Sequence, residues 1–154
     1  MRRITLAATA CALAIGTVAI AGGHGGNPAV QARNAHMSLY AFNLGILGDM
    51  AKGATEYNAE LASAIAGDLA AVAALSQAAY WPEGTAQGEV EGSRAKAEIW
   101  TDTAGIVEIG QQMAAASTAL AESAGGGLEA LQAGIGPVGK ACGDCHKAYR
   151  GPRN

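Results

Sequence analysis

Charged and aromatic residues are both scarce in this chain of 154 residues. Only 15% of the residues are charged and only 5% are aromatic. The formal net charge is −3, so the chain has no electrostatic basis for binding nucleic acid. Half of the residues are apolar, alanine dominates and β-branched residues are few, a composition that favours helices. The length predicts a single domain.

Long apolar runs are limited to the N-terminus, where residues 1–21 have the pattern of a secretory signal peptide. Arg2 and Arg3 supply its positive charge, residues 4–20 form its apolar stretch, and small residues follow. The alternative is a membrane anchor, but a run of about 17 residues is at the lower limit for spanning a bilayer. We therefore expect the signal to be removed, which leaves a periplasmic protein with no stable membrane insertion. The glycine-rich residues 22–28 would then form a flexible leader.

Cysteine is scarce too, and the positions of the cysteines matter more than their number. Of the three cysteines, Cys11 lies inside the predicted signal peptide. The mature chain therefore keeps only Cys142 and Cys145, in a compartment where a free pair normally forms a disulfide. What these two residues do decides the function.

Four stretches have apolar residues at alternating spacings of three and four, as on one face of a helix: residues 29–52, 55–79, 94–123 and 128–149. Such spacing is typical of helices that pack at a shallow angle in bundles. Mostly short connections predict an all-α, antiparallel up-down-up-down four-helix bundle over residues 29–154. Pro137 conflicts with this pattern, because proline inside a helix removes a hydrogen bond, and we expect it to kink or restart the last helix.

The residues Cys142-Gly143-Asp144-Cys145-His146 form the pattern C-x-x-C-H, which is typical of covalent attachment of haem c. Two thiols about one helical turn apart can add to the two vinyl groups on one edge of a haem, and the histidine that follows can then bind the iron. Both cysteines lie on the apolar face of the last predicted helix. The haem would therefore be inserted into the bundle.

Three different kinds of site could also use a pair of cysteines, and each fits this motif less well. A thioredoxin-like redox pair needs a βαβ setting, and the sequence shows no strands. A structural zinc site needs about four ligands, and neither His24 nor His36 is suitably spaced to complete one. A plain disulfide would account for the cysteines but not for His146.

The chain resembles the cytochrome c′ family, the class II c-type cytochromes. The resemblance rests on a C-x-x-C-H motif at the C-terminal end of a four-helix chain, and it covers nearly all of the mature sequence. Further matching features are Tyr149-Arg150 after the motif, Glu98-Ile99-Trp100, the turn Trp81-Pro82-Glu83-Gly84, and the stretch from Arg33 to Lys52-Gly53. The resemblance implies one covalent haem c with His146 as an iron ligand. It also implies a possible homodimer, since family members often dimerise through the first two helices.

Met37 is the candidate for the sixth iron ligand. In an antiparallel bundle the end of the last helix lies level with the start of the first, where Met37 offers a thioether suited to haem iron. Met50 is about 20 Å further along the same helix, and Met113 is expected about three turns away from this level. His36 lies off the apolar face, so we expect it to be solvated.

The resemblance leaves two states of the iron open. Low-spin members of the family use a methionine at this place, whereas many members have a non-ligating apolar residue and five-coordinate, high-spin iron. In the second state Met37 would be a packing residue, as a methionine on an apolar helix face usually is.

Three further residues are candidate contacts of the haem. Arg33 lies one turn before Met37 and could pair with a haem propionate, as the matching arginine of the family is thought to do, or it could be a surface arginine. Trp100 is expected to pack in the haem pocket. Arg150 could cover the ring of His146 or simply lie near the helix C-terminus.

Four basic residues surround the predicted haem helix of this acidic protein: Lys140, Lys147, Arg150 and Arg153. They could steer an acidic redox partner toward the haem edge. Equally, they could be the ordinary charge found at a helix C-terminus.

Two functions follow from the two states of the iron. With His146 and Met37 as axial ligands, the protein would carry electrons between redox partner proteins, because filled axial positions suit electron transfer. With an open sixth position, it would bind nitric oxide or carbon monoxide. We do not expect an enzyme, because the sequence places no acid–base pair opposite the iron.

Overall fold

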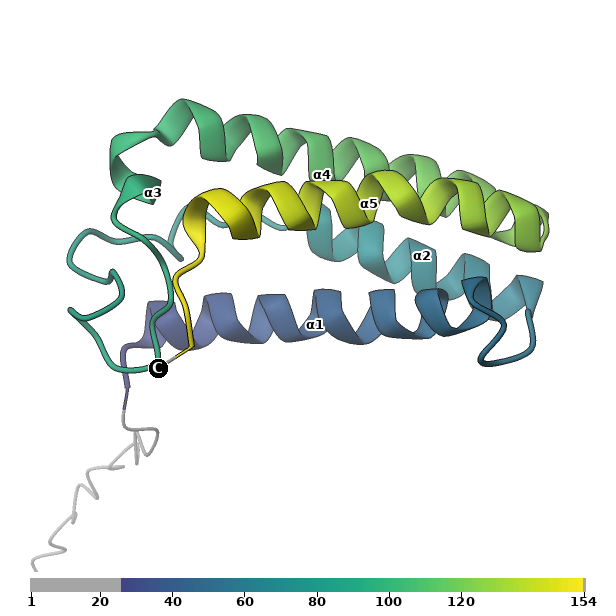
Figure 1. The fold of residues 1–154 in the computed structure, drawn as a ribbon, viewed down its shortest axis with the longest axis horizontal. Coiled ribbons are helices and arrows are strands. Elements are labelled where there is room, and N and C mark those ends of the chain that lie inside the picture. Colours follow the sequence, from purple (N-terminus) through teal and green to yellow (C-terminus); the bar gives the residue numbers. More distant parts are fainter. Residues whose placement is uncertain (1–25, 154) are drawn as a thin grey trace, which may run out of the picture.

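Helices account for most of residues 26–153, the part of the chain that the computed structural model describes (Figure 1). The helices are α1 Pro28–Ala51, α2 Ala59–Ala74, α3 Glu98–Thr101, α4 Thr103–Ser123 and α5 Leu128–Tyr149, with a 3-10 turn, η1, at Ala124–Gly126. Within residues 26–153 the β contact is a single isolated bridge between Ala95 and Arg150. No helix in this range is both long and apolar enough to cross a membrane. The predicted signal peptide and residues 22–25 of the predicted leader lie outside the described residues.

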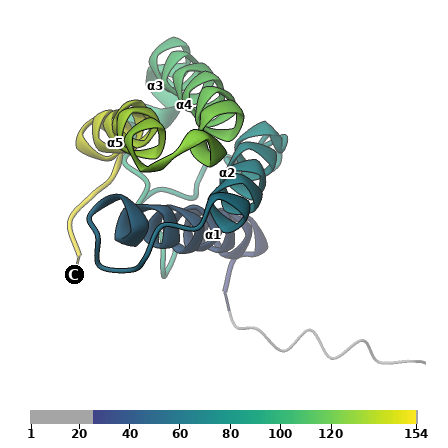
Figure 2. The same ribbon diagram turned by 90° about the vertical axis from the view of Figure 1, so that its right-hand side faces the viewer.

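The four long helices form the predicted antiparallel bundle. Viewed along its length, α1, α2, α4 and α5 surround a shared interior (Figure 2). The most extensive packing is of α4 against α2 on one side and α5 on the other. The interior is filled by fully buried aliphatic side chains, among them Leu47, Leu69, Leu120, Leu131 and Val138. Each comes from the apolar face of its helix, so the sequence periodicity accounts for the core.

Capping residues set where the helices begin and end. The side chain of Asn27 accepts a hydrogen bond from the backbone nitrogen of Ala29 at 2.9 Å, and Pro28 occupies the first turn of α1. Asn58 caps α2 in the same way. Gly53, with a φ of +74°, follows the C-terminal end of α1, where a residue with a side chain would be strained.

Two predicted helices are longer than the observed ones. The second was expected to run to residue 79, but α2 ends at Ala74, because Leu75 adopts an extended conformation. The third was expected to begin at residue 94, but α3 begins at Glu98 and the chain breaks again at Asp102 before α4. Between Leu75 and Ala97 the chain has no long helix and folds across one end of the bundle (Figure 1).

Of the two effects expected at Pro137, a kink or a restart of the helix, the restart does not occur. α5 is one continuous helix from Leu128 to Tyr149 with Pro137 inside it. The proline removes the hydrogen bond that the carbonyl of Ala133 would accept, but both residues are exposed. Water can therefore satisfy that carbonyl, and the helix continues.

Candidate haem-binding site

A cavity of about 920 Å³ lies at the end of the bundle that residues 75–97 cover. Its walls come from α1, α4 and the last turns of α5, and its volume is within the range of cofactor pockets. Cys142, Cys145 and His146 all line it. The sequence predicted that the motif lies on the interior side of the last helix, and the structure shows it there.

The two motif cysteines are free and half-buried on α5. Burial raises the pKa of the Cys142 thiol, and burial together with the neighbouring Cys142 raises that of Cys145. Both thiols are therefore protonated at neutral pH. Within residues 26–153 no three His, Cys, Asp or Glu side chains gather where they could hold a metal ion.

His146 has the ionisation state that an iron ligand needs. Burial lowers the pKa of its imidazole, and the positive charges of Arg150 and Arg94 lower it further. The ring is therefore neutral near pH 7, with a nitrogen lone pair to offer. Two thiols, a neutral imidazole and an apolar cavity together fit a covalently attached haem c.

Met37 and Tyr40 of α1 line the same cavity. Met37 is 36% exposed, so it lies at the edge of the cavity rather than deep in the core. The pKa of Tyr40 is raised to about 12 by burial and by the electrostatic influence of Cys142 and Cys145. The start of α1 therefore lies level with the motif, as the antiparallel topology predicts.

The expectation that Met113 lies away from the haem was wrong. Met113 lines the cavity, and its Sδ is 3.9 Å from the Sγ of Cys142. The structure pairs Tyr149 with Asp102, at the start of α4. Cys142 lies seven residues before Tyr149, about 10 Å into the bundle, where the flexible thioether of Met113 reaches it.

Arg33 lines the cavity, yet its guanidinium is bound to protein atoms. Nη1 donates to the carbonyl of Tyr80 at 3.2 Å and to Oγ1 of Thr85 at 3.0 Å. Nη2 donates to the carbonyl of Thr85 at 2.6 Å and to Oγ of Ser93 at 2.9 Å. The guanidinium also lies 5.0 Å from the ring centre of Trp81. Arg33 is therefore a buried residue and not a surface arginine, and pairing with a propionate remains a prediction.

His36 is buried, contrary to the expectation that it is solvated. It is 2% exposed, and its ring packs edge-on against Tyr40 and Tyr80, with centroids 4.7 and 5.7 Å away. Neither ring nitrogen has a hydrogen-bond partner among the described residues. The side of α1 that carries His36 is covered by the segment after α2, and helix periodicity alone does not reveal that cover.

Trp100 lines the cavity, and Tyr149 and Asp102 join two elements beside it. The indole nitrogen of Trp100 donates to the carbonyl of Trp81 at 3.0 Å. The hydroxyl of Tyr149 donates to Oδ2 of Asp102 at 2.6 Å, and Oδ1 of Asp102 accepts the backbone nitrogen of Gly105 at 3.1 Å. Sequence reasoning missed this pair. The signal that could have found it is an aspartate directly before α4, which is a common capping position.

Arg94 and Lys96 bind the end of α5. Lys96 Nζ donates to the carbonyls of Lys147 and Ala148, both at 3.2 Å. Arg94 Nη2 donates to the carbonyl of Gly151 at 2.7 Å. These contacts hold the chain beyond the motif, so Arg150 lies on the cavity wall near His146.

The chain resembles known proteins over most of its length. The sequence model of the family described as Cytochrome C' matches residues 28–150. The chain is 37% identical over 150 residues to a cytochrome c′ of Cereibacter sphaeroides, covering 97% of this chain and 98% of the relative.

Solved structures of the same kind share the fold. A cytochrome c′ from Rhodobacter Spheriodes has a TM-score of 0.79 and 38% identity, covering 81% of this chain and 96% of that one. A ferrous variant of cytochrome c′ from Alcaligenes xylosoxidans with bound nitric oxide has a TM-score of 0.70 and 32% identity, with 81% and 94% covered. A third cytochrome c′, described as showing ligand-controlled dimer dissociation, has a TM-score of 0.73 and 30% identity, with 80% and 95% covered.

Proposed function

The chain belongs to the cytochrome c′ family and carries covalent haem c, and we propose that it works in the periplasm as a gas-binding cytochrome. In this proposal the iron is held by His146 on one face and binds nitric oxide or carbon monoxide on the other. The observation that carries it is the cavity that places the complete C-x-x-C-H motif beside α1. The nitric oxide complex of a relative supports the choice of ligand. The proposal includes no catalytic reaction.

The residues of the chain have separate tasks in this function. Cys142 and Cys145 attach the haem through thioether bonds, and His146 supplies a neutral imidazole to the iron. The haem, when bound, supplies an iron that accepts electrons or a small ligand. The apolar cavity excludes water, and the contacts of Asp102, Arg94 and Lys96 hold the end of α5 in place.

A second candidate function is electron transfer with Met37 as the sixth ligand. It is favoured by one observation, that Met37 lines the cavity on the helix expected to face the iron. Met/His ligation raises the reduction potential and suits an electron carrier. Solved structures of relatives with bound nitric oxide or carbon monoxide support the open site instead.

Replacing Met37 with leucine distinguishes the two functions. If the distal site is open, oxidised wild-type protein and Met37→Leu should both have high-spin absorption spectra. If Met37 binds the iron, the wild-type spectrum should be low-spin and only the variant high-spin. Met50→Leu is the matched control, because Met50 is 2% exposed in the core and does not line the cavity.

The chain also has a surface suited to pairing with a second copy. Leu39 and Phe42 lie one turn apart on α1 and are 48% and 64% exposed. We propose that this apolar strip forms part of a homodimer interface. A relative with a dissociating dimer supports this proposal.

A further inference from the structure

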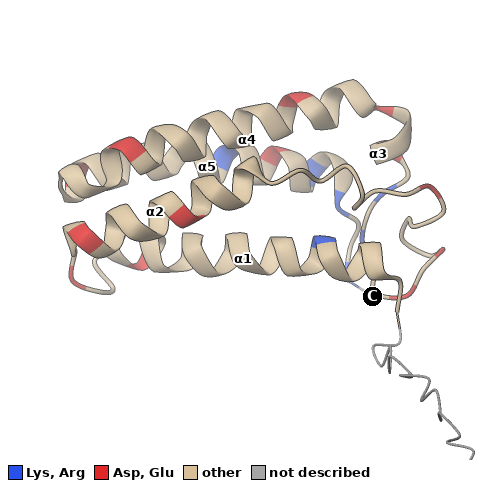
Figure 3. Ribbon diagram, turned by 180° about the vertical axis from the view of Figure 1, so that it is seen from behind, with Lys and Arg blue, Asp and Glu red and all other residues tan. Residues whose placement is uncertain are grey.

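The positive charge of the chain is concentrated at one place. Arg33 is buried and Lys52 is exposed at the far end of α1. All other lysines and arginines of residues 26–153 lie in two short segments, 94–96 and 140–153. These segments are far apart in the sequence and are joined in space by the bridge between Ala95 and Arg150. Figure 3 shows most of the blue on α5 and the adjoining coil, with one blue band on α1, while red lies on α2, α4 and the loops and once on α5.

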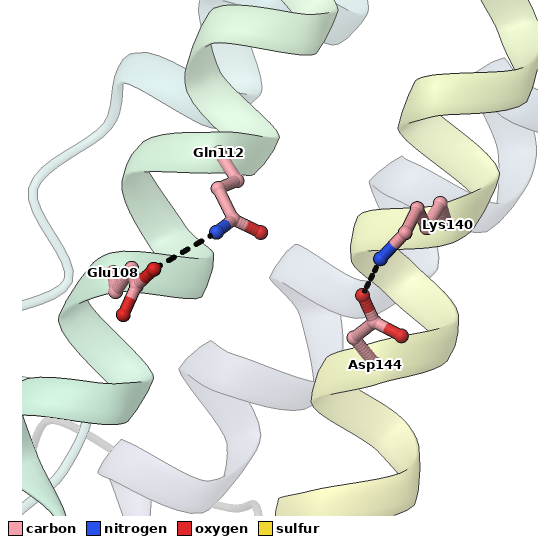
Figure 4. Close-up of polar contacts among 4 residues, drawn as sticks. All are labelled: Glu108, Gln112, Lys140 and Asp144. Atoms are coloured by element: carbon pink, nitrogen blue, oxygen red, sulfur yellow. Dashed lines mark hydrogen bonds and ion pairs between the residues drawn. The ribbon is translucent and has the colours of Figure 1, made fainter.

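Most of this charge is not neutralised within the protein. Lys140 forms an ion pair with Asp144 one turn later (Figure 4). The two segments hold five other cations, which we call the basic face: Arg94, Lys96, Lys147, Arg150 and Arg153. No carboxylate among the described residues lies within ion-pair distance of any of these five side chains. Lys96 and Arg94 bind backbone carbonyls, and those contacts leave their charge in place.

The basic face borders the haem cavity. Arg94 and Arg150 line the cavity together with Cys145 and His146. Cys145 and His146 are only partly buried, so the attachment edge of the haem is close to the surface there. A protein bound to this face would thus approach the haem by a short path.

We propose that the basic face is the docking surface for an acidic redox protein that exchanges single electrons with the haem. This inference rests on the proposed haem site and names the kind of partner that the site uses. One electron passes between the partner's redox centre and the iron, and no bond is made or broken. The dipole between the basic face and the acidic remainder would orient the two proteins before contact.

The surroundings of the basic face favour a protein over a lipid surface. Glu83 lines the haem cavity with Arg94 and Arg150, Glu91 lies beside Arg94 and Arg153, and the chain as a whole is negatively charged. An anionic bilayer is flat and extended, so it would meet these glutamates and be repelled. An acidic protein patch of limited size can contact the basic face alone.

The test is the second-order rate at which a reduced plant-type [2Fe–2S] ferredoxin, chosen for its acidic surface, reduces the oxidised holoprotein. Stopped-flow absorption follows the haem at a series of salt concentrations. We expect the rate to fall steeply as salt rises. In low salt, Lys147→Glu should lower it by about tenfold, and Arg153→Glu should act in the same direction.

Lys52→Glu is the matched control. It makes the same change of charge on an exposed lysine at the other end of the bundle, next to Asp49. We expect it to alter the rate by less than about twofold. Reduction by dithionite, a small reagent, should proceed similarly in all variants, which shows that their haem is intact.

Three results would overturn the proposal. The first is a ferredoxin rate that is independent of salt or rises with it. The second is an equal effect of Lys147→Glu and Lys52→Glu. In the third, the holoprotein binds phosphatidylglycerol vesicles, and Lys147→Glu abolishes this binding but leaves the ferredoxin rate unchanged. The basic face would then be a lipid contact. A protein isolated without haem would instead contradict the haem function itself.

Discussion

A single carboxylate joins the haem helix to the start of α4. Asp102 accepts the hydroxyl of Tyr149 through one oxygen and caps α4 through the other. Tyr149 lies one turn beyond His146 and is 6% exposed, with its ring packed among Ile99, Trp100 and Cys145. This pair sets the register between α5 and α4, and therefore the height of the motif in the bundle.

Removing the hydroxyl with Tyr149→Phe should lower the melting temperature of the holoprotein by a few degrees at pH 7. The hydrogen bond from Tyr149 holds the pKa of Asp102 below its usual value, and the same bond raises the pKa of Tyr149 to about 12. The stabilisation is thus complete between the ordinary pKa of an aspartate and that of a tyrosine. It is lost as the pH falls through the lowered pKa of Asp102, or as it rises through the raised pKa of Tyr149.

Thermal unfolding followed by circular dichroism checks this pH dependence. The difference in melting temperature between wild type and Tyr149→Phe should shrink as the pH falls below the ordinary pKa of an aspartate and through the lowered pKa of Asp102. A difference that stays constant as the pH falls well below the ordinary pKa of an aspartate would mean that the hydroxyl does not act through the Asp102 carboxylate.

Gly105 should not tolerate a methyl group, although alanine is the better helix former. A Cβ there would clash with both Oδ2 of Asp102 and the hydroxyl of Tyr149. We expect Gly105→Ala to lower the melting temperature. The control Gly139→Ala, with open space around its Cβ, should raise stability by up to about 1 kcal/mol. Equal stabilisation by both substitutions would show that Asp102 and Tyr149 can separate without loss.

At the residue scale, the sequence predicted which side chains have the chemistry for haem attachment better than it predicted which residues surround each side chain. The C-x-x-C-H motif could be recognised from spacing alone because it is a local pattern, and the structure places its cysteines and histidine on the cavity wall. The burial of His36 and the contact of Met113 with Cys142 depend on which segments meet in space. No local pattern contains that information.

Arg33 makes more hydrogen bonds to the irregular segment between α2 and α3 than any other side chain of the bundle, and Asn34 and Trp100 add one each. Arg33 of α1 binds it at Tyr80, Thr85 and Ser93. Since this segment forms one end of the cavity, Arg33 acts on the haem site by positioning its cover.

Arg33→Ala should destabilise the protein by roughly 2–4 kcal/mol, since it leaves buried acceptors without a donor. Arg33→Lys should recover only part of this loss, because an ammonium group cannot reproduce the planar fork. Hydrogen exchange measured by mass spectrometry should show faster exchange in residues 80–93 than in α2. Uniformly faster exchange along the whole chain would indicate a general loss of stability, not release of this segment.

The boundaries of the elements were predicted less well than their existence. The long helices follow from apolar periodicity, but α2 stops before its apolar pattern does, at the extended Leu75. Likewise, Asp102 interrupts the third predicted helix because its side chain caps α4. Both departures come from local changes in backbone conformation that tertiary contacts stabilise, and both help to form the cavity.

For the molecule as a whole, the bundle and the place of the haem could be predicted, and the occupant of the sixth iron position could not. Topology places Met37 near the motif, and the structure agrees. Whether the thioether of Met37 binds the iron depends on the distance between its sulfur and the iron. Neither the sequence pattern nor the helix register determines that distance.

Self-association is the second property of the whole molecule that can be tested. Phe42→Glu should shift holoprotein from dimer toward monomer in sedimentation velocity experiments, because it places a charge in the apolar strip of α1. Leu128→Glu, a similar substitution at an exposed leucine on α5, should leave the dimer unchanged. If Phe42→Glu sediments like wild type, the strip is not part of an interface.

The gas-binding function is tested most simply by adding carbon monoxide to the reduced wild-type holoprotein and recording its absorption spectrum. We predict a prompt, saturable shift of the main haem band, because the face of the haem opposite His146 is open in the proposed function. A spectrum that carbon monoxide leaves unchanged would contradict that function. The sixth position would then be filled, and the protein would be an electron carrier with Met37 as the first candidate ligand.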